Sequence, residues 1–189
     1  ADKHNLFVVE DAAQAVGAVY KNKKAGSFGI GAGFSLHPLK NLHVHGDGGI
    51  VTTDDLELYK KIIKYRNHGL QNRDECEFWG INTRLDSINA GIGNIKLRYL
   101  NEWNNRYRKI ARMYTDNLNS YVKVPKEMDY EKPIYHRYII RHPDRNKLQA
   151  FLANSGIETK VNYPIPLHLQ LAATDLGYKK GDFPVTEQL

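Results

Sequence analysis

Four side chains of the sequence have types that suit the binding of a polar ligand. Lys40 follows a Gly-rich apolar run, residues 31–39, that contains Ser35, while Asp11 and Gln14 follow an earlier apolar run. An amine, a hydroxyl, a carboxylate and an amide can together hold charged and polar atoms of a small molecule. Taken one at a time, these residues fit local roles better, as a turn cap, a backbone contact and a surface cation. Only their combination therefore indicates a functional site.

The elements that position these residues are predicted to be buried strands. Residues 6–9 form a compact apolar run, as expected for a strand of a parallel sheet that is covered on both faces. Residues 31–37 and 48–54 are predicted to form two further buried strands. Open α/β sheets bind their ligands at the carboxyl ends of such strands. Asp11, Ser35 and Lys40 are therefore expected at a ligand-binding edge.

The segments between these strands predict turns and a helix. A short helical turn is expected around residues 12–16, and residues 16–29 are predicted to form a hairpin with its turn at Asn22 to Lys24. Asp54 and Asp55 are good N-caps for a helix over the sequence DLELYKKIIKYR. The succession of strands and helices predicts an α/β fold.

A change of periodicity at Asp86 predicts a long helical segment. Apolar residues recur every three or four positions as far as Leu118, which indicates one helix or two helices joined end to end. At about 1.5 Å per residue, about 30 residues extend for about 45 Å, which is longer than a small core can cover. The segment is therefore expected to link two domains, residues 1–100 and 101–189.

The second domain is predicted to be small and of the α+β class. Residues 135–141 and 157–163 are predicted to be strands, and between them a helix is expected to begin at Asp144 and to stop at Gly156. The first strand lies near residue 1, and no further element closes this second domain. We therefore expect the chain to be part of a longer protein.

Charge and cysteine content limit the classes of function. The 189 residues carry a net charge of +6 with a pI near 9.2, but only residues 21–24 form a tight basic cluster. Nucleic-acid binding is therefore not expected, and the positive balance suits an anionic substrate or cofactor equally well. The one cysteine, Cys76, cannot form an intrachain disulfide, and its acidic neighbours make its thiol a weak nucleophile.

Metal binding and membrane insertion are not expected either. His37, His43 and His45 have no cysteine or carboxylate at the usual spacing of metal ligands. No run approaches the roughly 18 apolar residues of a membrane span, and nothing at the N-terminus looks like a secretion signal. The expected location is the cytoplasm.

Eight motifs occur in an order that is similar to that of one known family. They are VVEDAAQAVGA (8–18), FSLHPLKN (34–41), GDGGIVTTD (46–54), RNHG (66–69), GINTRLD (80–86), YHRYIIR (135–141), NYPIPLHLQ (162–170) and GDFPVTE (181–187). They resemble the DegT/StrS family of sugar-nucleotide aminotransferases, fold type I enzymes that use pyridoxal 5'-phosphate (PLP), over essentially the whole chain. The resemblance implies part of a large, mostly parallel-sheet domain and a small α+β C-terminal domain, joined by the long helix.

The resemblance implies a role in cofactor binding for five residues. Lys40 aligns with the lysine that forms a Schiff base with the PLP aldehyde and later shuttles a proton. Asp11 aligns with the carboxylate that pairs with the pyridine nitrogen and keeps the ring an electron sink. Gln14 aligns with a contact to the ring oxygen, and the small Ala13 with the residue under the ring. Ser35 aligns with a contact to the phosphate.

Further roles concern the neighbouring subunit and the substrate. Asn82 resembles an asparagine that reaches the phosphate of the other subunit's cofactor, which requires a homodimer with shared active sites. Tyr163 and His168 either line the sugar side of the site or pack a Pro-rich loop. Asn162 stands where the family often has histidine, and the family's upstream contacts to PLP are absent from this chain.

The implied reaction is a ping-pong transamination. L-Glutamate gives up its amino group and leaves as 2-oxoglutarate, and the amine passes to a keto carbon of a nucleotide-linked deoxysugar, in deoxyamino sugar and polysaccharide biosynthesis. Deoxygenases of the same fold replace the lysine by histidine, so Lys40 favours transamination. A non-catalytic regulatory or scaffolding relative is the other alternative. The sugar carbon and the nucleotide are not fixed by the sequence.

Overall fold

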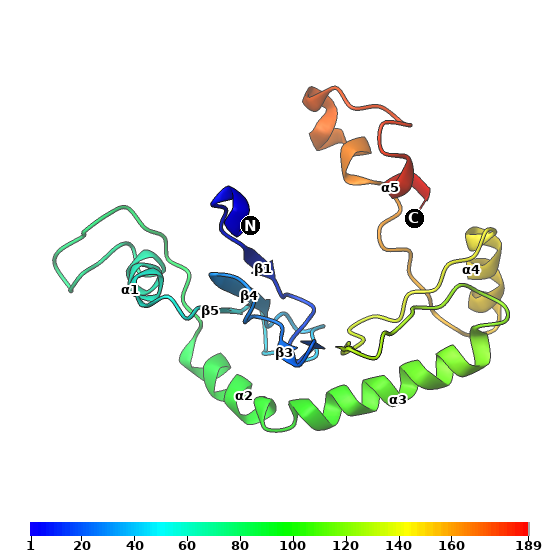
Figure 1. The fold of residues 1–189 in the computed structure, drawn as a ribbon, viewed down its shortest axis with the longest axis horizontal. Coiled ribbons are helices and arrows are strands. Elements are labelled where there is room, and N and C mark those ends of the chain that lie inside the picture. The colour runs from blue at the N-terminus through cyan, green and yellow to red at the C-terminus, as the bar shows by residue number, and fades with distance from the viewer. Residues whose placement is uncertain (189) are drawn as a thin grey trace. The chain divides into compact units, whose positions relative to one another are not determined.

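The computed structural model describes residues 1–188, and Figure 1 shows its helices and strands. Internal contacts divide the chain into two compact units: Ala1–Asn117 with Pro125–Tyr138, and Leu118–Val124 with Ile139–Leu189. Leu189, the last residue of the expected second domain, lies outside the described residues. The domain boundary expected after residue 100 stays a prediction.

The first unit contains the sheet that carries the candidate residues. Strand β1 (Val9–Asp11) pairs in parallel with β4 (Gly31–Ser35), which pairs antiparallel with β5 (Gly49–Thr52), in the order β1-β4-β5. The register sets Asp11 opposite Gly33, so the carboxyl ends of β1 and β4 lie at the same edge. This edge is the one that the sequence predicted for ligand binding.

Two of the three predicted strands differ from expectation. The first begins at Val9 rather than Leu6, and Phe7 and Val9 are exposed, because no described residue covers their apolar side chains. All four residues of β5 are exposed, so the prediction that this strand is buried was wrong. In β4, Gly31 and Ala32 are buried as predicted and the last three residues are half-buried, because this strand has a strand on each side.

A second small sheet combines the predicted hairpin with a distant segment. Strands β2 (Val19–Tyr20) and β3 (Lys23–Lys24) are antiparallel, and β6 (Glu131–Lys132) pairs with the free edge of β2. The turn consists of Lys21 and Asn22, both with positive φ, and not of residues 22–24 as predicted. A two-residue turn of this kind matches the twist of the strands it joins, which explains the shift.

The helices of the first unit follow the predicted caps and periodicity. Helix α1 (Leu56–Tyr65) begins after Asp55, whose carboxylate accepts the N–H groups of Glu57 and Leu58. The long segment forms two helices end to end, α2 (Ser87–Leu97) and α3 (Leu100–Leu118). Of the two alternatives that the sequence left open, one long helix or two helices joined end to end, the second is observed. The N-cap of α1 is Asp55 rather than Asp54.

The second unit has less regular structure than the sequence predicts. Helix α4 (Arg145–Asn154) follows Asp144 and stops before Gly156, as predicted, but the expected cap is not formed, because the side chain of Asp144 makes no hydrogen bond to the first turn. Short helices follow at Leu167–Leu169, Leu171–Leu176 and Pro184–Gln188 (α5). Residues 157–163 form no strand, and residues 135–141 contain only one isolated bridge, between Arg141 and Lys123. Both strand predictions were wrong, because an extended segment becomes a strand only beside a partner.

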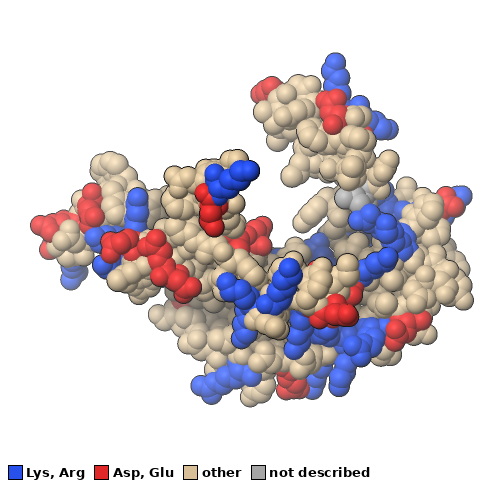
Figure 2. All heavy atoms as spheres, viewed as in Figure 1, with Lys and Arg blue, Asp and Glu red and all other residues tan. Residues whose placement is uncertain are grey.

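The core of the first unit lies directly under the loop that carries Lys40. Its buried residues are Leu36, Leu42, Val44 and Leu100, with Val16 and Leu85 packed against them. Basic and acidic side chains are interspersed over the face shown in Figure 2, in keeping with their spread along the sequence. Within residues 1–188, every helix is too short or too polar to cross a bilayer.

Candidate active site

Lys40 lies in a loop whose two ends are joined and buried. The N–H of Val44 donates to the carbonyl of Leu36 at 2.9 Å, and Leu36 and Val44 are both 1% exposed. Between them, the N–H of Lys40 donates to the carbonyl of His37 at 2.8 Å. Because both ends of the loop are fixed in the core, the backbone of Lys40 is held at one position beyond the end of β4.

A pair of buried amides fixes this loop to α3. The Nδ2 of Asn41 donates to Oδ1 of Asn104 at 2.9 Å and to the carbonyl of Ile134 at 3.2 Å, and Asn104 donates to the carbonyl of Val16 at 3.0 Å. Asn41 and Asn104 are only 4% and 6% exposed. Buried polar groups persist when they are hydrogen-bonded, and these amides therefore join three segments around Lys40.

An open cavity of about 360 Å³ is lined in part by this loop, residues 36–44. Its polar lining comes from Ser35, His37, Lys40, Asp47, His136 and Arg137. The volume falls within the roughly 300–1,000 Å³ of small-molecule pockets. The structure thus brings together two of the residues expected to contact a cofactor, Ser35 and Lys40.

The charges around this cavity are mainly positive. Lys40 and Arg137 contribute cations, and Asp47 contributes the one carboxylate among the lining residues. Burial lowers the pKa of His136, and the positive charges of Lys40 and Arg137 lower it further. His136 is therefore neutral at pH 7, able to donate or accept a hydrogen bond, and the cavity favours an anionic ligand.

Asp11, Ala13 and Gln14 lie at the neighbouring strand end and do not line this cavity. Asp11 is exposed, and its Oδ1 accepts the N–H of Ala13 at 3.1 Å. The Oγ of Ser35 likewise accepts the N–H of His37 at 3.2 Å. Both local roles considered from sequence are thus observed. They leave further acceptor positions on the carboxylate and the hydroxyl, so ligand binding by these groups stays a prediction.

Asn82 lies in the loop between α1 and α2. It forms an isolated bridge with Asn67, and its Oδ1 accepts Nε of Arg84 at 3.1 Å. The side chain is exposed and lies outside the cavity of its own chain. Its contact with a neighbouring subunit's cofactor stays a prediction.

Tyr163 and His168 belong to the second unit. Tyr163 is exposed, whereas the imidazole of His168 packs on the ring of Phe183, and its Nε2 lies 2.9 Å from Oε1 of Glu187. The N–H of Gly181 and the contact with His168 hold the pKa of Glu187 below its usual value, against the effect of desolvation. His168 thus has a packing role within its unit, and the substrate roles of both residues stay predictions.

Besides His37, which was considered only as a metal ligand, sequence reasoning missed three polar residues that line the cavity: Asp47, His136 and Arg137. Asp47 stood within the motif GDGGIVTTD, and the other two within YHRYIIR, which was interpreted as a strand and given no chemistry. In the second motif, the pattern that could have indicated a binding role is the pair of basic residues, His136 and Arg137, between two tyrosines. Among the described residues, no group of three His, Cys, Asp or Glu side chains could hold a metal ion.

Comparison with known proteins assigns the family. The family model of the DegT/DnrJ/EryC1/StrS aminotransferases matches residues 1–189. The chain belongs to the DegT/DnrJ/EryC1/StrS aminotransferase family. The family predicted from the motifs is confirmed.

Two curated relatives of this family member illustrate the functions found among similar proteins. A pleiotropic regulatory protein of Geobacillus stearothermophilus is 43% identical over 192 residues, and the match covers 100% of this chain and 52% of the relative. The dTDP-3-amino-3,6-dideoxy-α-D-galactopyranose transaminase of Aneurinibacillus thermoaerophilus is 42% identical, with 100% and 52% covered. The chain spans about half the length of the curated relatives it matches.

Two solved structures are similar to this family member. Streptomyces venezuelae DesV, in complex with a ketimine intermediate, has a TM-score of 0.96 and 36% identity, covering 100% of this chain and 51% of DesV. Spr1654 of Streptococcus pneumoniae, in its PLP form, has a TM-score of 0.86 and 26% identity, covering 96% and 50%. The predicted fold class, the α/β fold of PLP enzymes of fold type I, is confirmed.

Proposed function

We propose that this protein is a PLP-dependent aminotransferase that moves an amino group from L-glutamate to a keto carbon of a nucleotide-linked deoxysugar. The observation that carries the proposal is the cavity at the end of β4, in which Lys40 and Ser35 meet. The family and the dTDP-sugar transaminase among the relatives support the same reaction.

The residues around this edge of the sheet have the types that PLP requires. The amine of Lys40 suits an aldehyde, the hydroxyl of Ser35 suits a phosphate, and the carboxylate of Asp11 suits a protonated ring nitrogen. Gln14 provides an amide donor, and Ala13 a small side chain. When bound, PLP supplies an electron sink for the charge that develops as a Cα–H bond breaks.

The protein's own contribution is to position these groups. The buried ends of the loop and the amide of Asn41 hold the backbone of Lys40 in place, so this residue, with its Nζ amine, lines the cavity from a fixed base. In the proposed role, this Nζ holds the cofactor by its aldehyde and afterwards carries a proton at the substrate carbon. The carboxylate of Asp11 keeps a positive charge on the ring nitrogen.

Three further assignments are part of this proposal. Asn82 contacts the phosphate of the partner subunit's cofactor in a homodimer, and Tyr163 and His168 face the sugar. The exposure of Asn82 and its position outside the cavity of its own chain support a contact in another subunit. The cytoplasm is the proposed location of the reaction.

The experiment is a comparison of two lysine variants in the complete protein. Lys40→Ala should lower the rate of amino transfer by about a thousand-fold or more, because general acid–base work alone contributes about 10²–10⁴. Lys61→Ala, which removes an exposed lysine of α1, should keep the rate of the unchanged protein. Release of 2-oxoglutarate from L-glutamate, with a nucleotide keto sugar present to accept the amino group, measures the rate, and substantial turnover by Lys40→Ala would overturn the proposal.

A regulatory function is the second candidate, because the relative at 43% identity is named as a pleiotropic regulatory protein. The two candidates differ in turnover by the complete protein. An absence of turnover with every nucleotide keto sugar, despite correct folding, would favour regulation.

A further inference from the structure

Arg137 is the one cation of the cavity that the proposed reaction leaves without a task. Its side chain is exposed, lines the cavity with Lys40, and makes no hydrogen bond or ion pair with any residue among 1–188. A guanidinium offers five donors in a planar fork that matches the two oxygens of a carboxylate or a phosphate. The group therefore has its full hydrogen-bonding capacity available for a ligand.

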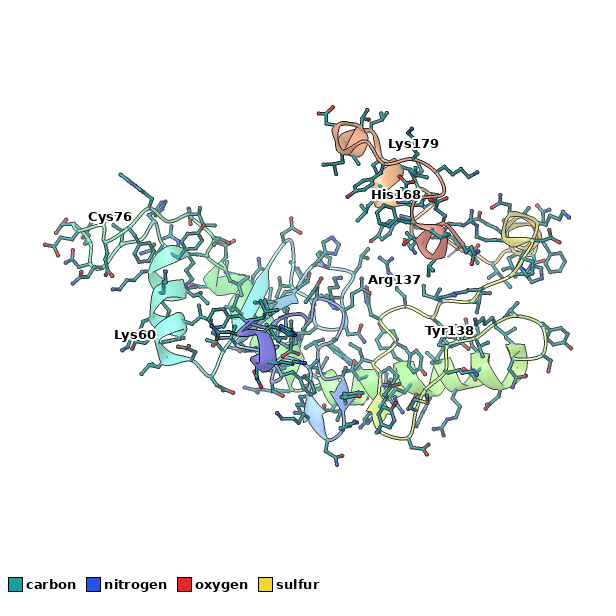
Figure 3. The ribbon with its side chains drawn as sticks, turned by 45° about the horizontal axis from the view of Figure 1, so that its top comes forward. Lys60, Cys76, Arg137, Tyr138, His168 and Lys179 are labelled. Carbon is teal, nitrogen blue, oxygen red and sulfur yellow. The ribbon has the colours of Figure 1, made fainter. Side chains whose placement is uncertain are left out.

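The backbone on both sides of Arg137 is anchored to other elements. Ile134 is 3% exposed and its carbonyl accepts the amide of Asn41, while the hydroxyl of Tyr138 lies 2.7 Å from that of Thr115 on α3. Figure 3 shows Tyr138 beside α3, and Arg137 on the side of the segment that faces away from the helix. Arg137 thus extends from a fixed base, as a residue that positions a ligand must.

Tyr135 strengthens the anchor on the N-terminal side of Arg137. Its hydroxyl donates to Glu127 at 2.9 Å, and Arg108 of α3 contacts both Glu127 and the carbonyl of Pro133. Burial and the bond to Glu127 raise the pKa of Tyr135 to about 12. The phenol therefore stays neutral and bonded over the ordinary pH range.

The electrostatics of the cavity also call for an anion beside Arg137. Lys40 and Arg137 both act on His136, whose pKa their charges lower, and both line the same cavity. Asp47 is the one lining carboxylate, and it forms no ion pair with any described residue. A bound anion would be attracted by both cations that line this cavity.

We propose that Arg137, flanked by His136, forms an anion subsite that selects the substrates of this enzyme by a carboxylate or phosphate group. The inference rests on the proposed function and extends it from the reacting amine to the group by which each substrate is held. In a ping-pong reaction the amino donor and the nucleotide sugar occupy one site in turn, and each carries such an anion.

The test is equilibrium binding, which does not depend on turnover. Isothermal titration calorimetry of the complete protein loaded with PLP would use two probes, glutarate for the donor and thymidine diphosphate for the nucleotide sugar. Arg137→Gln should weaken one or both by about tenfold or more, and Arg137→Lys should recover part of the loss because it keeps the charge but not the fork. Arg112→Gln, at an exposed position of α3, is the matched control and should leave both affinities unchanged.

The pattern of losses identifies the source of the anion. Weaker binding of glutarate alone assigns the subsite to the donor carboxylate, weaker binding of thymidine diphosphate alone assigns it to the diphosphate, and loss of both assigns it to both half-reactions. Unchanged affinities, no binding of either probe to the unchanged protein, or a loss confined to PLP affinity would overturn the proposal. Thermal unfolding of Arg137→Gln should match the unchanged protein, because the exposed side chain makes no hydrogen bond or ion pair with any of residues 1–188. The proposed function is tested separately, by the turnover of the Lys40→Ala variant, so a negative result in one experiment does not decide the other.

Discussion

Glu10, which precedes Asp11 in β1, contributes to the stability of the strand end. Its carboxylate accepts the N–H groups of Gly26, Phe28 and Gly29 at 2.7, 2.6 and 3.0 Å. Burial alone would raise the pKa of Glu10, but these three bonds and the charge of Lys23 lower it from its usual value. A carboxylate that is stabilised in the fold stabilises the fold in return.

This linkage predicts that the contribution of Glu10 to the free energy of unfolding depends on pH. Because the folded-state pKa lies below the unfolded value of about 4.5, the contribution is present above that pH and is lost as the pH falls through the folded-state pKa. Glu10→Gln should lower the free energy of unfolding by about 0.5–1.5 kcal/mol at pH 7, since an amide N–H replaces one acceptor at a site that solvent partly screens.

Chemical denaturation at several pH values between 7 and 3 measures this difference. The difference should shrink as the pH falls below the unfolded value of about 4.5 towards the lower folded-state pKa of Glu10. The exposed Glu158→Gln is the control and should differ little at any pH. A Glu10→Gln difference that stays constant towards acid pH would contradict the account.

At the residue scale, the sequence indicates which side chains could act in one site, but it does not indicate which distant residues they contact. Ser35 and Lys40 were placed in one site by motif and by strand ends, and the cavity brings them together. The bonds of Glu10 span 16 to 19 residues, and no spacing rule predicts them. The contacts of Asn41 with Asn104 and Ile134 span 63 and 93 residues, and are equally inaccessible to local patterns.

At the scale of elements, the buried pair of Asn41 and Asn104 joins the loop of Lys40 to α3. Asn104→Ala should lower the free energy of unfolding by about 1–3 kcal/mol for each polar group left without a partner. Asn105→Ala removes an exposed asparagine from the same helix and should change it by about 0.5 kcal/mol or less.

Urea denaturation of both variants of the complete protein checks this prediction, and amino-transfer rates check its consequence for the site. Because Asn41 is adjacent to Lys40, the Asn104 variant should also lose activity under conditions where it is folded. Equal stabilities of the Asn104 and Asn105 variants would show that the amide pair does not fix the loop.

Elements with strong local signals were predicted well. Helix α1 follows the cap of Asp55, and the segment 87–118 follows its apolar period, because caps and periodicity act within a few residues. Helix α4 begins after Asp144 as predicted, although the side chain of Asp144 makes no cap hydrogen bond. The strands predicted at 135–141 and 157–163 did not form. Tyr135 adopts a positive φ, and its neighbour Tyr138 bonds a side chain of α3 instead of a backbone partner. Strand formation depends on such distant partners, which a single sequence does not reveal.

At the scale of the whole molecule, the proposed dimer makes a prediction about mixed subunits. If Asn82 serves the partner's site and Lys40 its own, Lys40→Ala and Asn82→Ala would each inactivate the homodimer. A mixed dimer would contain one site with both changes and one intact site. Random re-assortment of equal amounts should therefore restore about a quarter of the original rate, since about half of the dimers are mixed.

Co-refolding of the two inactive variants and measurement of amino transfer test this prediction. Lys40→Ala mixed with Lys40→Ala,Asn82→Ala is the control and should stay inactive. Failure of the first mixture to recover activity, when sedimentation shows a dimer, would mean that Asn82 serves its own subunit.

The central claim is that Lys40 is the nucleophile of a PLP-dependent aminotransferase. The most direct measurement is to incubate the complete protein with PLP, reduce it with borohydride, and map the modified peptide by mass spectrometry. The account predicts one pyridoxyl group, on Lys40, that is absent from the Lys40→Ala variant. No adduct, or an adduct on another lysine, would contradict it.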